Sequence, residues 1–169
     1  MTAASAATLV PAVTLYNVIL AVHIMAVVIA FGVTFAYPIM FAVGARSDPR
    51  SLPLLHRIEY TIERVLINGG LVLVLGAGIF LASDGHHWSE FFVQWGLGAV
   101  VVIGALVGAV MIPSAKRAET VAARDIAAAG GGPIVMGEEY RALVRRLSTV
   151  GSLLSLLVLV TILFMTIQP

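Results

Sequence analysis

The 169-residue sequence contains no cysteine, and charged residues make up only 11% of it. The absence of cysteine excludes disulfides, thiol nucleophiles, iron–sulfur clusters and Cys-type zinc sites. Ten Lys and Arg residues against nine Asp and Glu residues leave a formal net charge of +1, which gives no electrostatic basis for binding nucleic acid. The sequence also lacks a nucleophile–base set, a phosphate-binding Gly loop and a dinucleotide fingerprint. Any metal or redox chemistry must therefore use His, carboxylate, Met or a prosthetic group.

Hydrophobic residues, in contrast, form 60% of the chain, and the mean hydropathy of +1.02 is far above that of a soluble domain. Four apolar segments are each long enough to cross about 30 Å of hydrocarbon as a helix that rises about 1.5 Å per residue. They occupy residues 15–43, 65–82, 92–113 and 147–167. We therefore expect an all-α polytopic membrane protein, in which residues 1–169 form a single membrane domain, a four-transmembrane-helix bundle in the lipid bilayer.

The basic residues are confined to two stretches, residues 44–64 and 114–146. Because Lys and Arg accumulate in cytoplasmic loops, we expect both stretches to be cytoplasmic and both termini to lie on the outer side. No Lys or Arg precedes Arg46, so the first segment lacks the basic start of a secretory signal, and it is also too long for the apolar part of one. We expect it to remain as the first helix.

The first cytoplasmic loop carries two carboxylates at helical spacing. Glu59 and Glu63 share one helical face, with Arg57 before them and Arg64 after them. This pattern predicts a solvent-exposed ion-pair face rather than a catalytic carboxylate pair.

Proline and glycine predict how the helices bend and pack. Pro38 predicts a kink near the cytoplasmic end of the first helix, because its ring clashes with the carbonyl of Thr34. The small residues of the later helices predict close helix–helix contacts, since lipid provides no hydrophobic drive for helices to associate. These residues are Gly70, Gly76 and Gly78 in the second span and Gly104 and Gly108 in the third.

His23 is the chemically informative residue of the first span. An ionisable side chain inside an apolar segment is a functional candidate, because burial in hydrocarbon is costly without a partner. Residues at helical spacing from it are small or polar, which indicates that His23 faces the bundle interior. They are Tyr16, Ala26, Ala30, Thr34 and Tyr37.

Burial favours the neutral imidazole, which is the form that ligates metals. Ala26 and Ala30 would leave a flat patch beside His23 for a planar macrocycle, and Tyr16 is a further candidate ligand. Two alternatives remain for His23. In the first, His23 is a structural residue that forms a hydrogen bond to Ser152, Ser155 or Thr161. In the second, His23 belongs to a proton or solute path.

His86 and His87 lie in the short outer loop. Such a pair is typical of a wet surface loop, and the alternative is a metal site, with copper as the metal. Helix rise puts the pair about 10 Å or more nearer the outer water than His23, so we do not expect a bis-His haem within one chain.

The run from Val22 to Val28, which contains His23, is followed by Gly32, by Tyr37-Pro38 and by the Arg57–Arg64 entry into a Gly-rich second helix. In this order and spacing the first three helices resemble a group of small predicted integral membrane proteins of unknown function. That group is distantly similar to the copper-resistance D-type membrane proteins and to the bacterial haem-linked protoporphyrinogen oxidases. In the oxidases a first-helix His serves b-type haem together with a Lys in a later span.

His23 matches that histidine, whereas no Lys lies within a predicted span. The resemblance implies a four-helix core in the bacterial inner (cytoplasmic) membrane. It further implies a haem b site at His23, used for redox work or within a larger membrane complex. A cofactor-free accessory subunit is the second expectation, and a copper- or solute-handling permease component is the third. Other membrane subunits, or copies of the same chain, are the expected protein partners.

Overall fold

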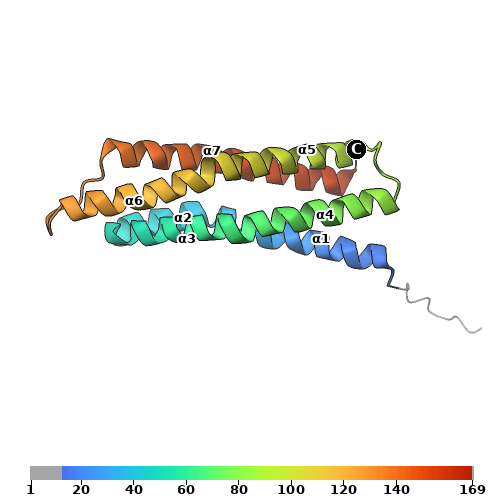
Figure 1. The fold of residues 1–169 in the computed structure, drawn as a ribbon, viewed down its shortest axis with the longest axis horizontal. Helices are drawn as coiled ribbons and strands as arrows, with labels where there is room; N and C mark the ends of the chain where they lie inside the picture. Colours follow the sequence, from blue (N-terminus) through green and yellow to red (C-terminus); the bar gives the residue numbers. More distant parts are fainter. Residues whose placement is uncertain (1–12, 169) are drawn as a thin grey trace, which may run out of the picture.

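The computed structural model describes residues 13–168, which form an elongated bundle of four long helical segments (Figure 1). These residues contain no β-strand, and each segment is long and apolar enough to cross a membrane. The predicted all-α bundle with four candidate spans is therefore confirmed. In chain order the elements are α1 (Leu15–Gly32), η1 (Val33–Phe35), α2 (Tyr37–Ser47), η2 (Pro49–Ser51), α3 (Leu52–Ile62), η3 (Glu63–Ile67), α4 (Asn68–Asp84), α5 (Phe91–Leu106), η4 (Val107–Met111), α6 (Ile112–Ala128) and α7 (Glu138–Ile167).

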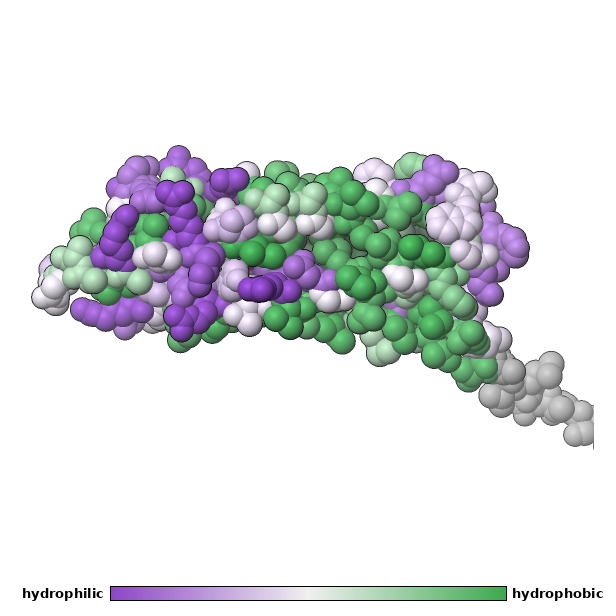
Figure 2. All heavy atoms as spheres, viewed as in Figure 1, coloured by the Kyte–Doolittle hydropathy of each residue, from purple (hydrophilic) through white to green (hydrophobic). Residues whose placement is uncertain are grey.

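The helical segments are longer than a bilayer requires. They contain 33, 36, 38 and 30 residues, whereas about 20 residues span the hydrocarbon. One end of the bundle must therefore project from the membrane. On the face drawn in Figure 2, the surface around α2, α3, α6 and the start of α7 is largely hydrophilic, and most of the remaining length is hydrophobic.

Both described chain ends lie at the same end of the bundle as the α4–α5 connection (Figure 1). The α2–α3 and α6–α7 connections lie at the opposite, hydrophilic end. The stretches that contain all the basic residues thus share one end, as the charge pattern requires. The expected outer position of the N-terminal tail falls on residues 1–12, which lie outside the described residues.

The helices pack as neighbouring pairs: α1 on α4, α3 on α6, and α7 on both α5 and α6. α1 and α4 pack closely at Gly70, where an added Cβ would overlap the Cβ of Ala30. Gly76 and Gly108, in contrast, have no atom within 4 Å of such a Cβ. Glycine thus brings two helices together at Gly70 and lies on an open face at the other two positions.

The first segment changes its helical geometry one turn before Pro38. Residues Val33–Phe35 form a 3-10 turn, and α2 restarts with Pro38 in its first turn. The hydroxyl of Thr34 donates to the Phe31 carbonyl at 2.7 Å. This interruption agrees with the steric effect expected of Pro38. The second and third segments each contain one π-helical turn, η3 and η4.

The side chain of Asp125 holds the end of the α6–α7 loop that leads into α7. Gly130 and Gly131 adopt positive φ values of 52° and 95°, which end the helix in a conformation that glycine adopts readily. Asp125 Oδ2 accepts the backbone N–H of Gly137 at 2.8 Å. Arg124 and Arg117 both bond to Glu139, which fixes the start of α7 against α6.

Candidate functional site

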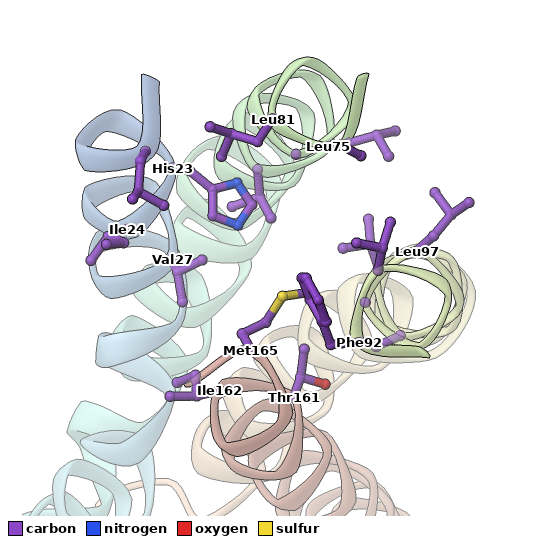
Figure 3. Close-up of a pocket in the computed structure, with 18 of the residues that line it drawn as sticks. His23, Ile24, Val27, Leu75, Leu81, Phe92, Leu97, Thr161, Ile162 and Met165 are labelled. Atoms are coloured by element: carbon purple, nitrogen blue, oxygen red, sulfur yellow. The ribbon is translucent and has the colours of Figure 1, made fainter. Parts of the chain in front are cut away.

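A cavity of about 400 Å³ lies between α1, α4, α5 and α7, in the half of the bundle that contains the described chain ends (Figure 3). Its walls are mainly aliphatic and aromatic side chains, among them Leu20, Val27, Leu75, Phe92, Val100 and Ile162. A volume of this size and an apolar wall with a few polar groups are typical of a site for a small molecule or cofactor.

His23 projects from α1 into this cavity between α4 and α7 (Figure 3). Its Nδ1 atom is buried and makes no side-chain hydrogen bond within residues 13–168. The backbone of Val74 on α4 lies within reach of the imidazole as a weak hydrogen-bond acceptor. A buried imidazole nitrogen without a protein partner is unusual, because desolvation of a polar group is normally offset by a hydrogen bond.

The expected hydroxyl partners of His23 are used elsewhere or make no bond to it. Thr161 accepts from Trp95 Nε1 at 3.1 Å and donates to the Leu157 carbonyl at 2.8 Å. Neither Ser152 nor Ser155 forms a side-chain hydrogen bond within residues 13–168. The three hydroxyls expected as structural partners of His23 therefore do not bond to it within the described residues.

Three glycines provide the space in which potential ligand side chains lie. A Cβ on Gly78 would be 3.3 Å from His23 Cε1, and a Cβ on Gly96 would overlap the terminal methyl of Met165. A Cβ on Gly85 would overlap the ring of His87 in the same way. His23, Met165 and His87 all line the cavity, so each is accommodated by the absence of a neighbouring side chain.

The structure brings His87 to the same cavity as His23, which helix rise alone does not predict. The α4–α5 loop folds back, because the N–H of His87 donates to the Ala82 carbonyl at 2.9 Å. The His87 ring lies 6.0 Å from the Phe92 ring. His86 adopts a positive φ of 58°, interacts through Nδ1 with the Asp84 carbonyl at 3.1 Å and does not line the cavity.

The other expected cofactor-binding residues of α1 lie on two different surfaces. Tyr16, near the start of α1, lines the cavity. Ala26 and Ala30 are buried but are absent from the lining, because α4 covers them at Gly70. Val27 and Phe31 take their place on the cavity wall. Within residues 13–168, no group of three or more His, Asp or Glu side chains is arranged to hold a metal ion.

A second polar group lies toward the hydrophilic end of the bundle. The prediction that Glu59 and Glu63 form an exposed ion-pair face is wrong, since they are only 4% and 1% exposed. Arg57 turns away and bonds to Glu119 at 2.8 Å, and Arg64 bonds to the Tyr60 hydroxyl at 2.8 Å. Both carboxylates instead face the packed side of the second segment.

The sequence analysis did not single out His56, although His56, Glu59 and Glu63 follow a helical face three and four residues apart. His56 is 1% exposed and contacts Glu59 Oε2 through Nδ1 at 2.9 Å. Its Nε2 lies 3.0 Å from the hydroxyl of Tyr140 on α7. The sequence did contain one signal of this burial: His56, Glu59 and Glu63 share a helical face with Leu52 and Ile67, which are buried.

Comparisons with known proteins identified no relative of this chain. No protein-family model, no curated protein and no solved structure matches the chain.

Proposed function

We propose that this protein binds b-type haem in the cavity between α1, α4, α5 and α7, with His23 as an axial ligand. The observation that supports this most directly is the imidazole of His23, which projects into an apolar cavity of about 400 Å³ and makes no side-chain hydrogen bond within residues 13–168. Neutral imidazole is a common axial ligand of haem iron. When bound, b-type haem supplies one-electron redox chemistry.

The cavity residues agree with a largely apolar group that has one polar edge. The middle of the cavity is aliphatic and aromatic, as a macrocycle requires, and Gly78 leaves room for the His23 ring. Polar side chains gather toward the end that contains the chain termini, where carboxylates of a ligand would meet water. They are Tyr16, Trp88, Thr166 and Gln168.

His87 and Met165 are the cavity side chains that we propose as the second axial ligand, since each carries an atom able to bind haem iron. In the resembling oxidases this role belongs to a Lys, and no Lys lines this cavity. The proposal therefore covers haem binding and does not extend to the oxidase reaction.

The absorption spectrum of the purified protein tests the proposal. We expect wild-type protein, expressed with sufficient haem and purified in mild detergent, to show a Soret band that His23→Ala removes. His86→Ala is the matched control, because His86 lies outside the cavity, and it should retain the band. His87→Ala and Met165→Leu identify the second ligand by a shifted spectrum. A folded but colourless wild-type protein would contradict haem binding and favour the cofactor-free accessory subunit.

We further propose that the protein lies in the bacterial cytoplasmic membrane, with its hydrophilic end in the cytoplasm and both termini outside. The support is the distribution of Lys and Arg, all of which fall in residues 44–64 and 114–146.

A further inference from the structure

The buried polar group at the hydrophilic end of the bundle is not part of the haem proposal. It consists of Tyr37 on α2, His56 and Glu59 on α3, Glu63 at the start of η3, and Tyr140 on α7. Each of these residues is at least nine-tenths buried. We refer to them as the carboxylate cluster.

Hydrogen bonds connect one side of the carboxylate cluster. The Tyr140 hydroxyl lies 3.0 Å from His56 Nε2, and His56 Nδ1 lies 2.9 Å from Glu59 Oε2. Tyr140 also lines a shallow groove on α7 together with Arg141, Arg145 and Ser148. The bonds thus form a continuous chain from Tyr140, a residue that lines the groove, to Glu59.

The other side of the cluster has polar atoms without partners. Glu63 Oε2 and the Tyr37 hydroxyl are both buried, and neither makes a hydrogen bond within the described residues. Leaving a carboxylate oxygen and a hydroxyl unbonded in a buried site is costly. Within residues 13–168, these two atoms are therefore the unbonded polar atoms of the carboxylate cluster, and Glu63 is the carboxylate that lacks a partner.

Among the described residues, no Lys or Arg side chain forms an ion pair with Glu59 or Glu63. Within residues 13–168, Arg57 and Lys116 pair with Glu119, Arg117 pairs with Glu139, and Arg141 and Arg145 pair with Glu138. Arg64 bonds to Tyr60 instead. His56 is the basic group in contact with the carboxylate cluster, and it contacts only Glu59.

The charges in the carboxylate cluster indicate that the species bound there is a proton. One imidazole can balance at most one of two buried carboxylates, and an unpaired buried charge is strongly unfavourable. Such a pair normally shares a proton, as closely spaced carboxyl groups do elsewhere. A divalent metal is disfavoured, because the described residues contain no group with metal-binding geometry.

We propose that Glu63, together with Glu59 and Tyr37, forms a buried proton-binding site, and that His56 and Tyr140 connect it to water at the hydrophilic end of the bundle. Uptake begins when Tyr140 receives a proton from water in the groove and passes its own proton to His56 Nε2. His56 then releases its Nδ1 proton to Glu59 Oε2 and changes tautomer. Glu59 in turn passes a proton to Glu63, four residues further along the same helical face, so each intermediate group gains and loses one proton and the net change is one proton on Glu63.

Infrared spectroscopy of the full-length protein in lipid nanodiscs tests the binding site, because a protonated carboxyl group has a carbonyl stretching band that a carboxylate lacks. At neutral pH we expect this band in wild type and in Glu59→Gln, and its loss in Glu63→Gln. Glu119→Gln is the matched control: Glu119 is also buried, but it pairs with Arg57 and Lys116, so the band should be unchanged.

The wild-type spectrum decides the question even if Glu63→Gln fails to fold. Absence of the band at neutral pH overturns the proposal, as does its persistence in a folded Glu63→Gln variant. Loss of the wild-type band on adding sodium chloride, but not choline chloride, at fixed pH also overturns it and identifies a monovalent cation site instead.

The link through Tyr140 has its own test. On transfer into D₂O the band shifts as the carboxyl proton exchanges, and Tyr140→Phe should slow this shift by about 10²-fold without moving the initial band. Thr149→Val, at a neighbouring groove position, is the control and should exchange at the wild-type rate. An unchanged exchange rate in Tyr140→Phe overturns the link, whether or not haem is bound at His23.

Discussion

The imidazole of His23 rests against the backbone of Gly78: a Cβ at position 78 would lie 3.3 Å from His23 Cε1 and 3.7 Å from Nδ1. The two residues come from α1 and α4, whose close packing continues at Gly70 and Ala30. On the side of α4 that meets α1, there is thus no side chain at the point where the His23 imidazole lies. The orientation of His23 is set by a neighbouring helix as much as by its own.

Gly78→Val should therefore displace the His23 ring and weaken haem retention. We expect the dissociation constant for haem, measured by titrating the apoprotein and following the Soret band, to rise about tenfold, which corresponds to ~1.4 kcal/mol of binding free energy. Gly76→Val is the matched control, since a Cβ at Gly76 has no atom within 4 Å. Equal dissociation constants for the two variants would show that Gly78 has no part in placing the ring.

Gly70→Val should destabilise the bundle by about 1–3 kcal/mol, the range for overpacked positions. A Cβ at Gly70 overlaps that of Ala30 and would lie 3.4 Å from its Cα, so α1 and α4 must move apart. The neighbouring Gly69→Val should be nearly neutral, because Gly69 has open space around it. Reversible denaturant unfolding in detergent measures the free energy of unfolding of both variants. A comparable loss of stability in Gly69→Val and Gly70→Val would contradict a specific α1–α4 contact.

The main architecture could be predicted from the sequence because apolar length determines it. A run of about 20 apolar residues has few alternatives to a membrane helix, and all four runs lie within long helices of the structure. The inward direction of His23 was also predictable, since Ala26, Ala30 and Tyr37 on the same face are all buried.

Which residues contact one another was less predictable, because this depends on distances between helices. Ala26 and Ala30 share a face with His23, yet α4 fills the space beside them and leaves the cavity to Val27 and Phe31. Glu59 and Glu63 were misinterpreted for a similar reason. Their neighbours Arg57 and Arg64 suggested local pairs, but α3 packs on α6, and Arg57 bonds to Glu119 there.

His56→Phe should cost about 3 kcal/mol of unfolding free energy, because Glu59 and Tyr140 both lose a buried hydrogen-bond partner. Phe retains the ring and its contact with Phe41, whose ring lies 4.5 Å away, so the loss reports the polar contacts. Arg57→Ala removes a 70% exposed side chain and should cost less than about 1 kcal/mol. Chemical unfolding of both variants distinguishes a buried polar link from general disruption.

Asp125 should make the α6–α7 connection sensitive to acid. Asp125 lies in the hydrophilic extension, outside the apolar spans, and the Gly137 N–H and then Arg124 hold its pKa below the usual 3.8. Its stabilising contribution is therefore present at neutral pH and is lost as pH falls through the lowered folded-state pKa. We expect amide exchange in residues 129–137, corrected for the intrinsic effect of pH, to accelerate over that range in wild type. Asp125→Ala should already exchange rapidly at neutral pH, and an unaltered loop in this variant would refute the role of Asp125.

The proposed orientation can be tested with little background, because the chain has no cysteine of its own. Ser89→Cys and Gly132→Cys place single thiols in exposed connections at opposite ends of the bundle. If the hydrophilic end is cytoplasmic, a membrane-impermeant maleimide should label Ser89→Cys in intact spheroplasts, and should label Gly132→Cys only after the membrane is opened. The reverse pattern would mean that the basic residues face outward. In that case the carboxylate cluster would exchange protons with the outer side, and the His23 cavity would lie toward the cytoplasm.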